Sequence, residues 1–368
     1  QAGGHSLSSW ERVRVRAFAG RSGGAILRWG EGFNTTKLTM DNSLQTITLL
    51  AVGDIMLVMG MNALIRQHGA NHPFHHVRPL LTRADIVIGN LEAPFTTHTA
   101  PTPYKRAESV KARRDYILRA HPSTAEGLKY AGFTAVGLAN NHMMDYQAQG
   151  LLDTLATLDR LGIAYSGAGR NLTEARRPAV IERKGLRVAL LSYSCILPIG
   201  SVATDNRMGI APARGFGAEE AMREDIARAR RETDFVILSI HWGEQLKCYP
   251  NNFQRRLGLK LLEWGADAVV GHHPHALQGI QVEAGKLIAY SLGDFVNLSS
   301  HKETAILQMA ISRPHQLESA CIIPHVLWQG QPRQAEGRMW RNIIARMRTL
   351  SAEWGTQIDE FGNIGLGG

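Results

Sequence analysis

The feature of this sequence that most constrains its fold is a series of short apolar runs, each followed by glycine, asparagine or histidine. Apolar residues recur about every 3.6 residues in the segments between these runs, which is the spacing of amphipathic helices. Strands are predicted at residues 47–52, 86–88, 134–138, 235–240, 268–270 and 287–291, and helices at 123–131, 147–161, 218–232 and 252–264. Strands that alternate with helices predict an α/β layered fold.

Two pairs of predicted strands depart from simple alternation. Residues 179–182 and 188–193 flank Gly185, and residues 280–283 and 287–291 flank Gly285. Each pair is predicted to form an antiparallel β-hairpin, because glycine marks a tight turn between apolar runs. The sequence therefore predicts two mixed sheets and not one doubly wound sheet.

The domain organisation follows from where this pattern begins and ends. Residues 1–45 are rich in glycine, serine and arginine and are predicted to be a poorly structured or tag-like extension. Met40 precedes the first strand, so residues 1–39 could lie upstream of the true start. Residues 46–312 carry the regular strand–helix pattern and are predicted to be one domain. Residues 313–368 hold a predicted strand and an amphipathic helix near residues 339–350, and are interpreted as a C-terminal appendage.

Composition limits the kinds of partner that this protein is expected to bind. The net charge is +9, with basic segments at residues 105–119, 223–231 and 333–348. These segments are solvated helix faces in one interpretation and attract an anionic substrate in the other. Nucleic acid is not expected, because the sequence has no zinc finger, no RNP-like motif and no basic run interleaved with aromatics. The oligomeric state is open.

Cysteine usage and hydropathy bear on localisation. The three cysteines, Cys195, Cys248 and Cys321, are far apart and form no CxxC pair, which argues against a disulfide scaffold and a thiolate zinc site. No run of about 20 apolar residues predicts a transmembrane helix. The cytoplasm is therefore favoured, and the alternative is attachment to the cell envelope through a segment that this chain does not contain.

Side chains that can bind metals recur where the predicted strands end. They are Asp54, Glu92, Asn141, His142, His241, His273 and His275. Strand ends of an α/β sheet converge in space, so residues far apart in sequence can meet there. Carboxylates, an amide oxygen and imidazoles together suit one or two divalent ions such as Zn, Mn or Fe.

Each of these residues also has a structural explanation when it is taken singly. Asp54 and Glu92 could be turn residues or helix N-caps, and His241 could be a hydrogen-bonded core residue. Residues 271–275, Gly-His-His-Pro-His, are the most specific segment, because three imidazoles surround a turn fixed by Pro274. Ligand residue types at several separate strand ends are difficult to explain without a metal site.

The strand ends carry a set of motifs in a fixed order: Gly53-Asp54, Asn90-Leu91-Glu92, Leu138-Ala139-Asn140-Asn141-His142 with Asp145-Tyr146, His241-Trp242-Gly243, Gly271-His272-His273-Pro274-His275 with Gln278-Gly279, and Tyr290-Ser291-Leu292-Gly293-Asp294-Phe295. As an ordered set, these motifs resemble the CapA family of poly-γ-glutamate capsule biosynthesis proteins, relatives of the calcineurin-like metallophosphatases. The resemblance covers residues 46–312, and Gly167-Ala168-Gly169 with Glu174-Ala175 also belongs to it.

The resemblance implies a four-layer α/β/β/α sandwich and a role for each matching residue. The implied metal ligands are Asp54, Glu92 as the bridge, Asn141, His241, His273 and His275. His142 would be a general acid or an electrostatic stabiliser, and Asp145 would orient it or merely cap the following helix. Further candidates for metal or substrate binding are His272, Asp294, Asn90 and Asn140, and which two of the three clustered histidines are ligands is open.

The sequence departs from the family patterns at three positions. Met56 stands where metallophosphatases have the histidine of an Asp-x-His motif, so one metal loses an imidazole and the site could hold one ion. Glu92 stands where phosphatases have an aspartate. Asp294 stands where CapA proteins usually have asparagine, and it could raise metal affinity, bind a substrate cation or cap a loop.

The predicted activity is hydrolysis by a hydroxide generated on the metal. The resemblance favours an amide bond of the γ-glutamyl or peptide type, in a polyanionic capsule-type polymer or a related small molecule. The first alternative is a phosphodiesterase or phosphomonoesterase on the same scaffold. The second is a polymer-binding subunit of a capsule synthase without catalytic activity.

Overall fold

The computed structural model describes residues 46–112, 115–298, 302–312 and 315–367. The extension predicted at residues 1–45 lies outside the described residues. The larger sheet has nine strands in the order β16-β15-β14-β1-β2-β3-β4, with β13 beside β1 and β17 beside β15. Its strands are β1 Ile47–Ile55, β2 Ile86–Leu91, β3 Ala135–Gly137, β4 Ala164–Ser166, β13 Asp294–Val296, β14 Glu303–Ser312, β15 Gln316–Trp328, β16 Gln331–Gln334 and β17 Asn363–Ile364.

The smaller sheet has six strands in the order β11-β12-β10-β9-β7-β6. They are β6 Ala179–Arg183, β7 Leu186–Ser194, β9 Phe235–His241, β10 Ala268–His272, β11 Ile280–Glu283 and β12 Lys286–Ala289. A separate ribbon pairs β5 Ala168–Gly169 with β8 Gly209–Ile210. Both large sheets contain parallel and antiparallel pairs, so the prediction of two mixed sheets is confirmed.

Both predicted hairpins are present in the smaller sheet. Strands β6 and β7 pair in antiparallel fashion, as do β11 and β12. The turn residues Lys184 and Gly185 have φ of 49° and 75°, and Ala284 and Gly285 have φ of 49° and 74°. Positive φ at both central residues is typical of a type I′ turn, whose twist matches that of the flanking strands.

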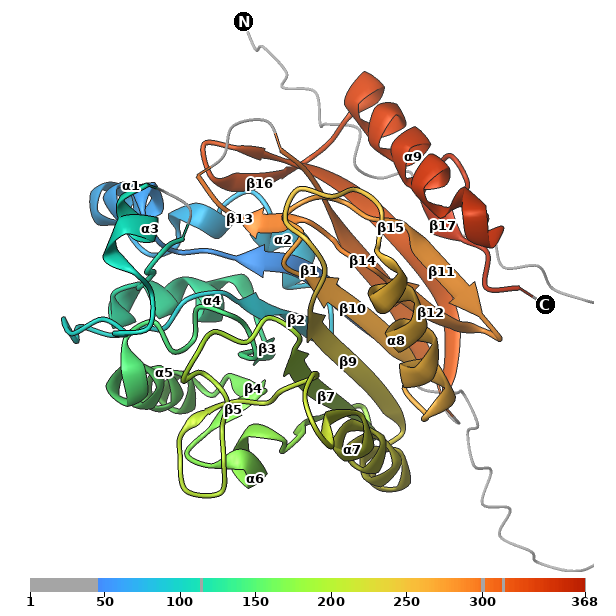
Figure 1. Ribbon diagram of the computed structural model, residues 1–368. Helices are drawn as coiled ribbons and strands as arrows, with labels where there is room; N and C mark the ends of the chain where they lie inside the picture. Colours follow the sequence, from blue (N-terminus) through green and yellow to red (C-terminus); the bar gives the residue numbers. More distant parts are fainter. Residues whose placement is uncertain (1–45, 113–114, 299–301, 313–314, 368) are drawn as a thin grey trace, which may run out of the picture. The chain divides into compact units, whose positions relative to one another are not determined.

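Helices α4 Glu126–Ala131, α5 Gln147–Leu161, α7 Ala218–Glu232 and α8 Asn252–Glu263 lie on the outer faces of the two sheets (Figure 1). Side chains of α4 and α5 share a core with the larger sheet, and those of α7 and α8 share one with the smaller sheet. The remaining helices are α1 Gly60–His68, α2 Arg78–Leu81, α3 Ala107–Lys111, α6 Leu172–Ala175 and α9 Gly337–Ser351. Within the described part of the chain, none of the helices combines the length and apolarity needed to cross a bilayer.

A third apolar core joins the two sheets face to face. It contains Leu49 and Ile88 from the larger sheet, and Leu190, Ile237 and Val270 from the smaller one. The four-layer α/β/β/α arrangement is thus confirmed. Its long, apolar parallel strands are buried on both faces, which is why they read as continuous apolar runs in the sequence.

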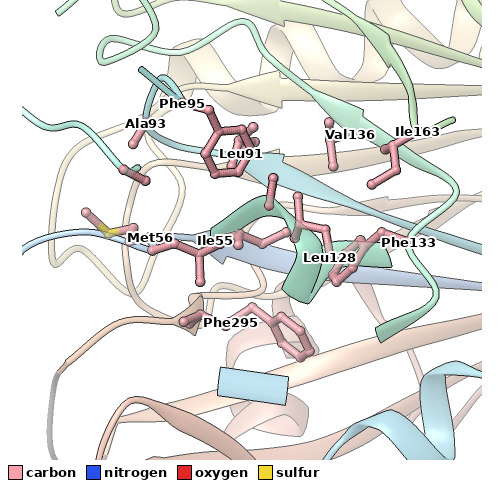
Figure 2. Close-up of a cluster of buried hydrophobic side chains, with 14 of the residues drawn as sticks. Ile55, Met56, Leu91, Ala93, Phe95, Leu128, Phe133, Val136, Ile163 and Phe295 are labelled. Atoms are coloured by element: carbon pink, nitrogen blue, oxygen red, sulfur yellow. The ribbon is translucent and has the colours of Figure 1, made fainter. Parts of the chain in front are cut away.

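The outer core of the larger sheet reaches the end of β1. Leu128 and Phe133, at and just after α4, lie near Ile55 and Phe295 in this cluster, and Met56 lies at its edge (Figure 2). Burial of such side chains contributes about 1.5–3 kcal/mol each. The strand ends that carry polar residues are therefore fixed by apolar packing immediately beside them.

The C-terminal segment is part of the sandwich. Strand β15 pairs with β14 along the whole of β14, and β16 and β17 pair with β15. Ile343 and Met347 of α9 are buried in the core that joins the two sheets. Leu44–Gly368 forms one compact unit. The predicted strand and helix are present, but they complete the larger sheet and the core between the two sheets, so the description as an appendage does not fit.

Candidate metal centre

The predicted site residues lie at the carboxyl ends of parallel strands from both sheets. Asp54 lies on β1, one residue before its end, and Glu92 follows β2 directly. Asn141 follows β3 after a short loop, His241 ends β9, and His273 follows β10. Parallel strands end at the same edge of a sheet. The two facing sheets therefore bring these residues together.

Two groups of potential ligands share the Glu92 carboxylate. Group A consists of Glu92, His241 and His273, and group B of Asp54, Glu92 and His275; in each group the ligand atoms lie within 4.8 Å of one another. Glu92 Oε1 lies 3.6 Å from His241 Nε2 and 3.7 Å from His275 Nε2. Asn141 Oδ1 lies 2.7 Å from His241 Nε2 and adds an oxygen to group A.

The Glu92 carboxylate tests whether a divalent cation fits here. Glu92 is fully buried, and neither of its oxygens has a hydrogen-bond partner among the described residues. Burial and the negative charge of Asp54 raise the pKa of Glu92 well above its ordinary value. A buried charge without a partner is costly, and a bound cation would remove that cost. The residues therefore fit a divalent metal.

The imidazoles of group A are in the protonation state that binds metals. Burial, together with the neighbouring His273, lowers the pKa of His241 well below its ordinary value. Burial and His275 lower the pKa of His273 to about 4. Both rings are therefore neutral at pH 7, and a neutral imidazole is the form that binds a metal. Carboxylate, amide and imidazole donors in this combination suit Zn, Mn or Fe.

Asp54 is held in its ionised form. Its Oδ1 accepts a hydrogen bond from Asn90 Nδ2 at 2.8 Å, and its Oδ2 accepts one from the His273 backbone N–H at 3.1 Å. Burial by itself would raise the pKa of Asp54, but the imidazoles of His272 and His275 hold it well below its ordinary value. The carboxylate is therefore charged and oriented before any ligand arrives.

The histidine loop after β10 presents two of its three imidazoles to the ligand groups. His273 and His275 have φ of 93° and 52°, a region that residues with a Cβ rarely adopt. Strained backbone of this kind is typical of functional sites. His272 lies on β10, with Nδ1 3.1 Å from Asp54 Oδ1. In the described structure His273 and His275 belong to the two ligand groups, whereas His272 faces Asp54.

The two further asparagine candidates connect the strand ends to one another. Asn90 Oδ1 accepts a hydrogen bond from Asn140 Nδ2 at 3.1 Å, and Asn140 Nδ2 also donates to the Leu91 carbonyl at 2.8 Å. Asn140 Oδ1 accepts from the His142 backbone N–H at 3.1 Å. Both asparagines are buried. Their polar atoms are used to hold the loop after β3 against β2.

Asp294 and Met56 lie beside group B. Asp294 Oδ1 lies 2.7 Å from His275 Nδ1, and Asp294 Oδ2 accepts hydrogen bonds from Lys302 Nζ at 2.7 Å and Asn297 Nδ2 at 2.9 Å. Asp294 thus orients an imidazole of group B. Asn297 Nδ2 also lies 3.4 Å from Met56 Sδ. Group B has three donor residues, whereas group A has three and the Asn141 oxygen.

His142 forms a hydrogen-bonded unit with Asp145 and Lys105. His142 Nδ1 lies 2.8 Å from Asp145 Oδ2, and Lys105 Nζ lies 2.6 Å from Asp145 Oδ1. Burial lowers the pKa of His142 despite the adjacent Asp145 carboxylate. A neutral His142 therefore donates its Nδ1–H to Asp145. Tyr146, not Asp145, precedes α5 as its N-cap, and it makes no side-chain capping bond, so Asp145 does not cap this helix.

Lys105 is the functional candidate that sequence reasoning missed. It lies at the start of one of the basic segments, yet its side chain is only 5% exposed. Its ammonium also donates to the Tyr116 carbonyl at 2.7 Å. No local pattern distinguishes Lys105 from the other basic residues of its segment. Only tertiary packing brings it to Asp145: the neighbouring Thr102 donates its backbone N–H to the Asp145 carbonyl at 2.8 Å, which holds this segment against the loop after β3.

Comparison with known proteins gives a family match over most of the described chain. The family model described as bacterial capsule synthesis protein PGA_cap matches residues 48–299. The capsule biosynthesis protein CapA of Bacillus anthracis is 30% identical over 318 residues, which are 84% of this chain and 75% of that protein. The PGA biosynthesis protein CapA of Bacillus subtilis (strain 168) is 35% identical over 246 residues, 67% of this chain and 62% of that protein.

Proposed function

This chain belongs to the bacterial capsule synthesis family PGA_cap, and on this premise we propose that it is a metal-dependent hydrolase acting on amide bonds. Its substrate would be a γ-glutamyl or peptide-type bond in a polyanionic capsule-type polymer or a related small molecule. The observation that carries the proposal is the buried Glu92 carboxylate, which is common to both ligand groups and has no hydrogen-bond partner among the described residues.

The proposed ligands are Glu92, Asn141, His241 and His273 on one side, and Asp54, Glu92 and His275 on the other. A divalent cation held there would lower the pKa of a water molecule and polarise the acyl oxygen. His142 would exchange the proton with the leaving nitrogen through Nε2, because its Nδ1–H is donated to Asp145. Asp145 and Lys105 would hold that imidazole in place.

Three observations support an amide in a polyanion over a phosphoester. The names of the two similar Bacillus proteins refer to capsule and PGA biosynthesis. Met56 stands at the position of the Asp-x-His imidazole, so group B lacks a donor that metallophosphatases have. The net charge of +9 also suits a polyanionic substrate.

The test combines metal analysis with a substrate screen. Protein loaded with Zn, Mn or Fe and freed of loose metal is analysed for bound metal, and then offered a γ-linked glutamate oligomer and a set of phosphoesters. We expect metal to be retained and new amino groups to be released from the oligomer. Glu92→Gln should lose both, whereas Glu220→Gln, on the exposed face of α7, should lose neither.

Each other outcome points to a named alternative. Hydrolysis of a phosphomonoester or a phosphodiester without amide cleavage would identify a phosphoesterase. Retention of metal with no turnover of either substrate class would favour a polymer-binding subunit. Failure of the wild-type protein to retain metal would contradict the assignment of the site itself.

A further inference from the structure

A cavity of about 340 Å³ opens beside the candidate metal centre. Asn141, the amide of the metal-ligand set, and Asp145, the partner of His142, line its inner side. Its other walls include residues 102–105 and, far from them in the sequence, residues 198–201 and 206–208. Its volume is at the lower end of the range typical of ligand pockets, roughly 300–1,000 Å³. A ligand that fills this cavity would lie next to the reacting centre.

The two walls of the cavity meet in a close contact. Gly200 has φ of 77°, and a Cβ added there would lie 2.3 Å from Cε2 of the Tyr104 ring. Glycine is therefore required at this position both by the backbone conformation and by the approach of the ring. Ser201, the next residue, hydrogen-bonds the Pro198 carbonyl at 2.7 Å. The cavity is thus bounded by specific packing and not by two independent loops.

Arg207 provides a cation on the wall of this cavity. Within the described part of the chain, its guanidinium donates to the Val202 carbonyl alone, from Nε at 3.3 Å and Nη2 at 3.1 Å. Among the described residues, no carboxylate lies within ion-pair distance of Arg207, whereas the other cation of the cavity, Lys105, is paired with Asp145. Arginine binds carboxylates in a planar, bidentate manner. Arg207 is therefore available to an anionic ligand.

The rest of the lining defines the kind of anion. Met144, Ile199 and Met208 give the cavity an apolar surface, and the Ile199 side chain is exposed there. Asn206 lies next to Arg207 and adds amide donors and acceptors. A ligand with a short methylene chain and a carboxylate matches both features, because its chain can contact the apolar side chains while its carboxylate reaches the guanidinium.

We propose that this cavity is a substrate-binding subsite for a carboxylate-bearing acyl unit, and that Arg207 recognises the carboxylate. The inference rests on the proposed function for the position of the subsite beside the scissile bond. The subsite itself depends only on the cavity and its charge. It assigns to Arg207 a role in substrate specificity that is separate from metal binding and from proton transfer.

Binding measured without turnover tests the subsite. The probes are a γ-linked glutamate trimer and the same trimer with its α-carboxylates converted to amides, titrated calorimetrically into metal-stripped protein at fixed low ionic strength. We expect Arg207→Gln to weaken binding of the acidic trimer by roughly tenfold to a hundredfold. Binding of the amidated trimer should be weak, with the same affinity for the wild type and for Arg207→Gln. Arg207→Lys should recover part of the affinity.

The variants are chosen so that a loss of folding is not mistaken for a loss of recognition. The turn that carries Arg207 is closed by backbone hydrogen bonds, with Thr204 N donating to Arg207 O at 3.0 Å, so it does not depend on the side chain. Arg223→Ala is the control, because Arg223 is an exposed arginine on α7 that pairs with Glu220. It should leave the affinity for the acidic trimer unchanged.

The outcomes for the subsite and for the proposed function are distinguishable. Loss of acidic-trimer binding in Arg207→Gln alone supports the subsite, even if the metal-loaded wild type cleaves no amide bond. Equal affinities of wild type and Arg207→Gln for the acidic trimer would overturn it, even if the wild type does cleave the oligomer. Equal weakening by Arg207→Gln and Arg223→Ala would also overturn it, since it would indicate a general charge effect.

Discussion

His275 Nδ1 lies 2.7 Å from Asp294 Oδ1, while Nε2 of the same ring faces Glu92 Oε1 at 3.7 Å. One side of the imidazole is therefore committed to a buried carboxylate and the other is directed to the ligand groups. A carboxylate in this position fixes the orientation of a metal-binding histidine and increases its basicity. The sequence left the role of the Asp294 carboxylate open; in the structure this carboxylate orients the imidazole of His275.

Asp294→Asn is expected to weaken metal binding at group B. The amide oxygen can still accept the hydrogen bond from His275, but it no longer supplies a negative charge, and Lys302 loses its ionic partner. Changes to partners of this kind typically cost about 10–100-fold in metal affinity. Competition with a chromogenic chelator measures the change. Asp294→Ala should weaken binding further, and equal affinities for all three proteins would contradict the role given to Asp294.

Met56→His is expected to increase the metal bound at group B. Met56 is two residues after Asp54, and its sulfur lies 3.4 Å from Asn297 Nδ2, which donates to the Asp294 carboxylate beside His275. The new imidazole would give group B a fourth donor. Elemental analysis after limited metal loading should show a higher metal-to-protein ratio than in the wild type, because group B has only three donor residues among the described residues. Unchanged occupancy would show that position 56 is too far from the group.

His142→Gln is expected to reduce turnover while leaving metal content unchanged. Loss of a general acid or base typically reduces the rate by about 10²–10⁴-fold. His142 is absent from both ligand groups, so bound metal should stay at the wild-type level. Parallel loss of metal and activity would instead place His142 among the ligands.

Lys105→Met is expected to destabilise the fold and to impair the proton transfer assigned to His142. It leaves the Asp145 carboxylate, which is 1% exposed, without its ammonium partner. Breaking a buried ion pair in this way costs about 3–5 kcal/mol. Urea unfolding measures the loss in free energy of unfolding. The value of kcat, compared at equal metal content, measures the effect on His142. Lys105→Arg keeps the charge and should recover part of both; equal loss in the two variants would point to packing alone.

The buried His325 is expected to make the folded protein less stable at low pH, independently of the metal centre. Burial lowers its pKa from 6.5 to about 4 in the folded protein, although its hydrogen bond to the Ile323 carbonyl partly opposes this. The unfolded chain therefore binds more protons between these pH values, and stability falls as pH falls through this range. A difference of this size corresponds to about 3 kcal/mol.

His325→Leu should remove this part of the pH dependence. The measurement is the free energy of unfolding in urea at pH 7 and pH 4.5, with a chelator present so that metal loss does not contribute. The variant should lose less stability than the wild type between the two pH values. Parallel pH profiles would mean that His325 is protonated in the folded protein.

Gly53→Ala is expected to distort the end of β1. A Cβ at this position would lie 1.9 Å from the Gly293 carbonyl oxygen, and the next residue, Asp54, donates its backbone N–H to that same oxygen at 3.0 Å. Overpacking of this kind typically costs about 1–3 kcal/mol. The midpoint temperature of thermal unfolding and the metal content should both decrease. Gly365→Ala, where the added Cβ meets ordinary contacts, should change neither.

Some parts of the site could be predicted because they depend on local pattern. The apolar runs predicted the central strands, and the residues after them predicted Glu92, Asn141, His241 and the histidine loop. Strand β1 extends to Ile55, beyond the predicted end at residue 52, because β13 pairs with its last residues. That pairing is between segments some 240 residues apart, and no local pattern encodes it.

The sequence by itself determined the alternation of strands and helices, the two hairpins and the kinds of candidate ligand at each strand end, since backbone periodicity and turn chemistry are local properties. The tertiary structure decided which side chains share a space. It brought Lys105 to Asp145, Asp294 to His275 and Arg207 to the cavity beside Asn141. These relationships arise because two facing sheets and their loops bury charged groups together, and the partner of a buried charge is chosen by packing in three dimensions.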